Sequence, residues 1–234
     1  MTSARSERES APYREVTGIV LKSAPIGEMD RRVVLLTKEL GKISAFARGA
    51  RRPNSPLVGV TAAFAFGKFR IYAGKSAYVL TEAQIDHFFA PLSRDMEKAC
   101  YGSYFLEVMD YLTRENNDEA MLLLLLYLSL RALENGRLPN ALIRRVFEQR
   151  CIVEEGEFAG LSYRNGSAED GAAQLLPGTV RALEHITQSP LSHLYGFEVS
   201  EEVSAQLKEV AADAARKYFT HPFTSLAVLE ALTA

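Results

Sequence analysis

The chain of 234 residues is 47% hydrophobic and 24% charged, which is the usual balance of folded proteins and excludes a largely disordered chain. Its longest apolar run, residues 120–130, is much shorter than the roughly 20 residues of a bilayer span, and the first ten residues lack the apolar segment of a secretion signal. Two cysteines without a CxxC pair exclude a disulfide framework and a four-cysteine zinc site, so we expect a cytoplasmic protein.

Charge divides the chain into two parts. Residues 1–80 hold 14 Lys or Arg against 6 Asp or Glu, whereas the remaining residues hold 13 basic and 23 acidic side chains. This asymmetry indicates a module that binds a polyanion, joined to a module with another task. We predict a flexible tail over residues 1–13, a nucleic-acid-binding domain over 14–86 and a helical domain over 87–234.

Five short runs of β-branched or alternating residues lie in the first of these domains. They predict strands at residues 16–22, 31–38, 42–48, 64–72 and 76–84. Gly41 separates the second run from the third, where a tight turn needs a positive φ. Since no helical pattern between the runs could cover an open sheet, we predict a closed five-stranded barrel, the OB-fold, within an α+β chain.

Alternation along the strands predicts outward faces that mix cations with aromatic rings. These faces are Lys42, Ser44, Phe46 and Arg48 in the third strand, and Phe66, Lys68, Arg70 and Tyr72 in the fourth. Single-stranded nucleic acid binds to such surfaces, because cations follow its phosphates and rings stack on its bases. Alternatively, Phe46 or Tyr72 closes the barrel end or packs on the next domain.

Residues 48–59, which follow the third strand, are rich in Gly, Pro, Asn and Ser and therefore predict a loop. Arg48, Arg51 and Arg52 of this loop either follow a phosphate backbone or form a solvated charge cluster without a ligand. The positive charge of the surrounding domain favours the first interpretation. The predicted nucleic-acid-binding set is Lys22, Arg31, Arg32, Lys42, Phe46, Arg48, Arg51, Arg52, Lys68, Arg70 and Tyr72.

Helical periodicity begins after Pro91. Ser93 is the predicted N-cap of a helix that reaches residue 112, and the next helix, at about 118–134, is so apolar that we predict it to be the central buried one. Asn135 and Gly136 end it. Further helices are predicted at 139–151, at 178–188 and, behind a Ser200 cap, at 201–219, with an irregular insert at about 154–176.

Motifs of catalysis are missing from the sequence. The four histidines have no metal-binding spacing, and no GxSxG, Walker-type or GxGxxG pattern occurs. We therefore expect no enzyme and no cofactor, although a hydrolase without a recognisable motif stays open. A binding protein of another class, an adaptor whose basic barrel docks an acidic protein, is the main alternative to nucleic-acid binding.

Four segments of the chain resemble the RecO family of bacterial recombination mediators. The segment GIVLKSAPIGEMDRRVVLLTKELGKISAFARGARRPNS, residues 18–55, is similar to the family's opening. The other three are YGSYFLEVMDYL at 101–112, RRVFEQR at 144–150 and RKYFTHPFTSLAVLEAL at 216–232. The resemblance implies an OB-fold, a helical C-terminal domain, binding of single- and double-stranded DNA, strand annealing, and a role in DNA repair and recombination after DNA damage.

The resemblance also implies partners. They are RecR, the C-terminal tail of single-stranded DNA-binding protein and, indirectly, RecA, at the nucleoid in the cytoplasm. For that acidic tail we expect an apolar cavity beside a cation, with Arg131 as the leading candidate and Arg144 and Arg145 as further ones. Alternatively, these arginines and Arg150 are partners of glutamates 134, 148 and 154.

One departure from the family concerns zinc. Many RecO proteins carry two CxxC pairs after the region that corresponds to residues 144–150, whereas residues 154–176 of this chain contain no cysteine. We therefore expect no metal in this chain. The insert is instead expected to be held by packing of Phe158, Leu161 and Tyr163.

Overall fold

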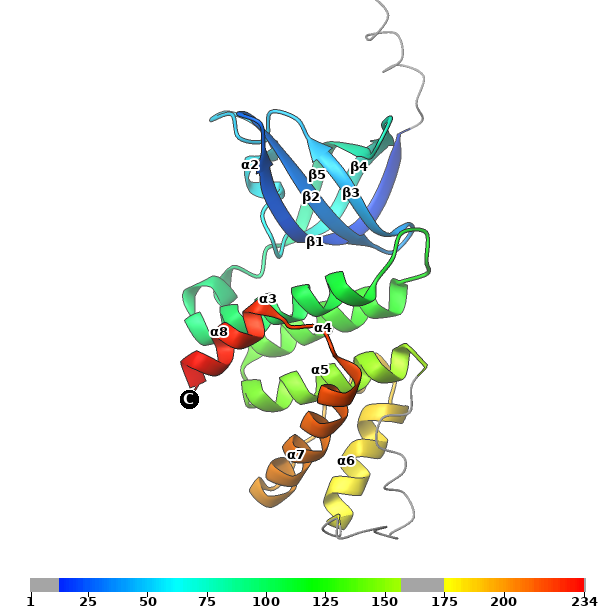
Figure 1. Cartoon of the computed structure of the whole chain (residues 1–234), viewed down its shortest axis with the longest axis vertical. Helices are drawn as coiled ribbons and strands as arrows, with labels where there is room; N and C mark the ends of the chain where they lie inside the picture. Colours follow the sequence, from blue (N-terminus) through cyan, green and yellow to red (C-terminus); the bar gives the residue numbers. More distant parts are fainter. Residues whose placement is uncertain (1–12, 157–174, 234) are drawn as a thin grey trace, which may run out of the picture. The chain divides into compact units, whose positions relative to one another are not determined.

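A closed barrel of five strands opens the computed structural model, which describes residues 13–156 and 175–233 (Figure 1). The strands are β1 (Arg14–Ile26), β2 (Asp30–Thr37), β3 (Gly41–Ala47), β4 (Phe66–Ala73) and β5 (Tyr78–His87). They close in the order β1-β2-β3-β5-β4, with β3 and β5 parallel and the other neighbours antiparallel. The predicted OB-fold barrel is confirmed.

Side chains alternate across the barrel wall as predicted. In β4, Phe69 and Ile71 are fully buried in the barrel core, whereas Lys68 and Arg70 between and beside them are exposed. The same period of two runs along β3, where Ile43 belongs to the core. Burial of each large apolar side chain stabilises the barrel by about 1.5–3 kcal/mol, so the inward positions set the strand register.

Two connections of the barrel are shaped by single residues. Gly41, between β2 and β3, has the predicted positive φ of 64°, and a Cβ there would lie 2.5 Å from the Arg114 carbonyl oxygen. The β3–β4 connection contains one short helix that its composition did not predict, α2 (Leu57–Val60). Leu57 enters the barrel core and so anchors this otherwise polar loop.

The rest of the described chain is helical. Its elements are η1 (Ala90–Arg94), α3 (Met96–Leu112), α4 (Ala120–Asn135), α5 (Asn140–Glu154), α6 (Pro177–Gln188), η3 (Leu191–His193), α7 (Glu201–Tyr218) and α8 (Thr224–Thr233). They confirm the predicted helical C-terminal region, and α8 was not among the predicted helices. Among the described residues, no helix has the length and apolarity that a membrane crossing requires.

Compact packing divides the chain into two units, and neither is continuous in sequence. The first unit combines residues 13–90 with Leu106–Leu123, and the second combines Pro91–Phe105 with the described residues from Leu124 onward. In the second unit, α5, α6 and α7 pack on one another.

Two helix predictions were wrong in detail. Asp95, not Ser93, caps α3, because the Lys98 N–H donates to Asp95 Oδ1 at 3.1 Å and Ser93 lies within η1. Seven residues of α4 are buried, but α5 is buried more completely, with nine buried residues, and Met121 and Leu124 of α4 are 49% and 42% exposed. The charged groups of α5 pair with one another, so their burial could not be read from apolar content.

The remaining local predictions concern helix ends, the N-terminal tail and the insert. The Ser200 cap is confirmed, since its Oγ accepts from the Val203 N–H at 3.4 Å, and Gly136 follows α4 with a φ of 66°. Of the predicted tail, residues 1–13, the first twelve lie outside the described residues, whereas Tyr13 packs on Arg70 and Tyr72. The predicted packing of Phe158, Leu161 and Tyr163 also lies outside them.

Candidate nucleic-acid interface

Five arginines gather where the β1–β2 turn meets the β3–β4 connection. We call them the arginine loop cluster: Arg31, Arg32, Arg48, Arg51 and Arg52. Strand register brings the two segments together, because Arg31 of β2 pairs with Ala47 at the end of β3. All of the cluster except the half-buried Arg31 is exposed. The sequence predicted each of these residues, and the structure brings them to one place.

Hydrogen bonds fix the two loops to each other. The Arg51 N–H donates to the Met29 carbonyl at 2.9 Å, and its guanidinium Nη1 donates to the Gly27 carbonyl at 3.2 Å. The Gly49 N–H donates to Asp30 Oδ1 at 2.7 Å, with Gly49 in the left-handed region at a φ of 68°. These bonds hold the backbones of the two loops together, and so place the Cα atoms of the arginines close to one another.

Within the described residues, no carboxylate forms an ion pair with the cluster. Arg31 and Arg32 donate instead to the neutral hydroxyls of Ser23, at 3.1 Å, and Ser44, at 2.8 Å. Five cations without carboxylate partners create a strongly positive surface, and phosphates are the groups such a surface attracts.

Apolar side chains accompany these arginines. Ile26 and Met29, at the β1–β2 turn, are 41% and 45% exposed. Neither residue was predicted as part of the site. Their position on either side of a turn that contains a glycine could have indicated that both are exposed. Exposed apolar groups beside cations can contact bases or sugars, or a partner protein.

Lys22 and Lys42, which were also predicted to bind nucleic acid, are engaged with Asp110 of α3. The Lys22 Nζ lies 2.7 Å from Asp110 Oδ2, and the Lys42 Nζ lies 3.2 Å from Oδ1. Burial alone would raise the pKa of Asp110, but the hydrogen bonds and charges of the two lysines outweigh it and hold the pKa below its ordinary value. Asp110 lies too far along the chain for sequence spacing to have paired it with either lysine.

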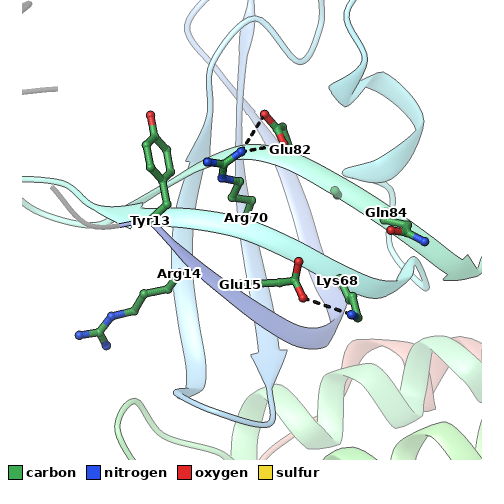
Figure 2. Close-up of a pocket in the computed structure, with 8 residues that line it drawn as sticks. Tyr13, Arg14, Glu15, Lys68, Arg70, Glu82 and Gln84 are labelled. Carbon is green, nitrogen blue, oxygen red and sulfur yellow. Dashed lines mark hydrogen bonds and ion pairs between the residues drawn. The ribbon is translucent and has the colours of Figure 1, made fainter. Parts of the chain in front are cut away.

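Lys68 and Arg70 of β4 also face carboxylates (Figure 2). Lys68 pairs with Glu15 of β1 at 3.2 Å, and Arg70 pairs with Glu82 of β5 at 3.3 Å. These side chains are all about half exposed or more, and such exposed pairs contribute only about 0–1 kcal/mol each. They lower the local positive charge without immobilising the cations.

The helical arginines are paired as the alternative interpretation expected. Glu148 of α5 is fully buried and accepts from Arg144 Nε at 2.8 Å, from Arg145 Nη1 at 2.7 Å and from the Tyr104 hydroxyl at 2.7 Å. Burial and the Glu148 charge both raise the pKa of Tyr104, so its hydroxyl stays a donor. Arg150 pairs with Glu154 at 2.7 Å.

Arg131 of α4 differs in exposure. Its side chain is 50% exposed and lies 3.3 Å from Glu134. Arg131 follows Leu128 by three residues and Leu124 by seven, so the three residues share a face of α4. Of the three arginines predicted to meet a peptide tail, it is the one that solvent reaches best.

Comparisons with known proteins agree across both halves of the chain. The family model "Recombination protein O N terminal" matches residues 13–89, and "Recombination protein O C terminal" matches residues 93–157. The "DNA repair protein RecO" of Acetivibrio thermocellus is 29% identical over 94% of this chain and 97% of its own length. The protein of the same name from Clostridium kluyveri is 27% identical over 87% of this chain and 88% of its own length. That of Moorella thermoacetica is 34% identical over 59% of this chain and 51% of its own length.

Proposed function

Since the chain belongs to the RecO family of DNA repair proteins, we propose that it binds single- and double-stranded DNA through the arginine loop cluster. The observation that carries the proposal is the contrast among the barrel cations. Lys22, Lys42, Lys68 and Arg70 each have a carboxylate partner, whereas no ion pair holds the cluster within the described chain. Phosphate oxygens would supply the missing partners, in bidentate contacts that suit guanidinium groups.

We further propose that the protein is a recombination mediator and not an enzyme. Family membership supports annealing of complementary strands and, with RecR, loading of RecA onto DNA coated by single-stranded DNA-binding protein. These steps need binding surfaces rather than a reacting group, so no cofactor is required. The place of action is then the nucleoid, in the cytoplasm.

For the C-terminal tail of single-stranded DNA-binding protein, the proposed contact is Arg131. Half of the Arg131 side chain is exposed, so its guanidinium can reach a terminal carboxylate while it stays beside Glu134. Arg144 and Arg145 hold a buried glutamate, and their part in this site is to keep α5 in place.

A second candidate function is docking of an acidic protein. The exposed Ile26 and Met29 favour it, since a protein interface combines apolar residues with arginine. DNA binding and protein docking differ in their response to generic oligonucleotides, which an adaptor specific for one protein would ignore.

The proposal is tested by replacing Arg48, Arg51 and Arg52 together with Glu. Binding of a labelled single-stranded oligonucleotide should weaken at least tenfold and annealing of complementary strands should slow, because three phosphate contacts become repulsive. The three side chains are exposed, so the melting temperature should hardly change. Wild-type affinity in the charge-reversed variant would refute DNA binding by this cluster.

A further inference from the structure

A pocket of about 450 Å³ opens on the outer surface of β1, β4 and β5 (Figure 2). It is separate from the arginine loop cluster, and only its Lys68 and Arg70 were predicted as ligand-binding residues. The other lining side chains include Tyr13, Glu15, Glu82 and Gln84. Its volume falls within the range of sites for small organic groups.

An aromatic ring in a fixed orientation lines this pocket. Tyr13 is 48% exposed, and its ring lies over the Arg70 guanidinium, with 4.5 Å between the guanidinium carbon and the ring centroid. The edge-to-face contact with Tyr72 brings the two ring centroids to 5.6 Å. These contacts orient the Tyr13 ring while leaving about half of the residue accessible, which is what stacking of another flat group requires.

The charges around the ring are largely balanced. Glu15 pairs with Lys68 and Glu82 with Arg70, and Arg14, which also lines the pocket, extends away from the Tyr13 ring (Figure 2). The pocket therefore carries much less uncompensated positive charge than the arginine loop cluster. It offers instead the two carboxylates and the Gln84 amide as hydrogen-bonding groups. A neutral flat group with polar edges matches this lining better than a phosphate does, and a nucleobase is such a group.

Strand pairing leads from the arginine loop cluster to this pocket. Arg32 of β2 is paired with Phe46 of β3, Phe46 with Val79 of β5, and Val79 with Tyr72 of β4. All four lie on the outer side of the barrel wall, because paired residues share a face and the next residue of β5, Leu80, belongs to the barrel core; Val79 among them is only 7% exposed. Three strand spacings of about 4.8 Å therefore separate Arg32 from Tyr72, which touches Tyr13.

We infer that Tyr13, supported by Arg70 and Tyr72, is a stacking site for one unpaired base of single-stranded DNA. The inference rests on the proposed function, since the arginine loop cluster holds the same strand by its phosphates. Phe46 and Tyr72 lie under the path between the two sites. The pocket thus adds recognition of unpaired bases to a surface that otherwise attracts any polyanion.

The test compares Tyr13→Ala and Tyr13→Phe on two oligonucleotides of equal length, one normal and one with abasic sites throughout. Tyr13→Ala should weaken binding of the normal strand about tenfold, since loss of one stacked base costs roughly 1–3 kcal/mol. Tyr13→Phe, which keeps the ring, should bind like wild type. On the abasic strand all three proteins should be equal, and Tyr13→Ala should leave the salt dependence unchanged.

Wild-type affinity of Tyr13→Ala for the normal strand, or an equal loss on the abasic strand, would overturn the stacking site. Tyr13→Leu, which keeps an apolar side chain, controls for a local packing defect and should lose the same affinity as Tyr13→Ala. The charge-reversed variant of Arg48, Arg51 and Arg52 is measured alongside. If it alone loses affinity, only the stacking site is wrong; if the wild-type protein binds neither strand, the proposed function fails too.

Discussion

Asp110 forms ion pairs with two lysines of the barrel, Lys22 and Lys42. Because Lys22 and Lys42 both contact its carboxylate, their replacement affects stability before it affects DNA binding. We predict that Asp110→Asn lowers the free energy of unfolding at pH 7 by about 1 kcal/mol, since the carboxylate is 22% exposed and the pairs are only partly desolvated. Urea denaturation measures the difference.

The contact of Asp110 with the two lysines makes the stability of the protein depend on pH. The pKa of Asp110 is lowered in the folded protein, so its stabilisation is present above the ordinary carboxyl pKa of 3.8 and is lost as pH falls through the lower folded value. The gap between wild type and Asp110→Asn should therefore shrink below about pH 4. Asp86→Asn, at an exposed position of β5, is the control. A gap that widens in acid would contradict the assignment.

Glu148 joins two arginines at helix spacing, Arg144 and Arg145, with Tyr104 of α3, which no spacing rule would have paired with it. Replacing Glu148 with Gln should lower the free energy of unfolding by about 3 kcal/mol. Arg144 and Arg145, which have little access to solvent, would then lose the carboxylate of α5 that pairs with them. Thermal denaturation checks this. A loss below 1 kcal/mol would mean that water or other groups already solvate Arg144 and Arg145.

Arg131 is half exposed, and its replacement by Ala takes an ion pair from Glu134, whose side chain is only 10% exposed. We predict that Arg131→Ala weakens binding of a peptide with the acidic tail sequence of single-stranded DNA-binding protein about tenfold, the usual effect of losing a charge-assisted contact. Arg137→Ala, exposed and just beyond the end of α4, should bind like wild type. Equal affinities of both variants in a fluorescence titration would place the tail elsewhere.

Two glycine turns of the barrel differ in how well they tolerate a side chain. Gly41 and Gly27 both have a positive φ, but a Cβ at Gly41 would collide with the carbonyl oxygens of Arg114 and Asn117, whereas nothing lies within 4 Å of one at Gly27. We predict that Gly27→Ala costs about 1–2 kcal/mol for the backbone conformation alone and that Gly41→Ala costs clearly more. Equal melting temperatures of the two variants would contradict this difference.

Elements built from local pattern could be predicted, and pairings between distant segments could not. Alternation in β3 and β4 was sufficient to assign their outward faces, because a period of two is a property of the strand itself. The Asp110 contacts and the burial of α5 depend on side chains that meet only after folding. Arg48, Arg51 and Arg52 could be grouped from the sequence because they are close in it, whereas strand register added Arg31 and Arg32 to them. Tyr13 became a candidate only when register placed it beside Arg70 and Tyr72.

For the whole molecule, the sequence predicts independence from metal. The chain has two cysteines, one of them buried in α5, and no described group of three His, Cys, Asp or Glu residues could hold a metal ion. Purified protein should therefore contain no stoichiometric zinc by elemental analysis, and a chelator should leave its melting temperature unchanged. Stoichiometric zinc, or unfolding by the chelator, would contradict this prediction.

The division of charge along the chain gives the molecule a positive barrel, and the central claim is that three loop arginines of this barrel hold DNA phosphates. The salt dependence of single-stranded DNA binding tests it most directly. Replacing Arg48, Arg51 and Arg52 with Gln should reduce the slope of log affinity against log salt concentration by about 2, at roughly 0.7 per lost phosphate contact. The matched replacement of Arg137, Arg181 and Arg216, exposed residues of the helical region, should leave the slope unchanged. An unchanged slope in the loop variant, or an equal reduction in both variants, would contradict the account.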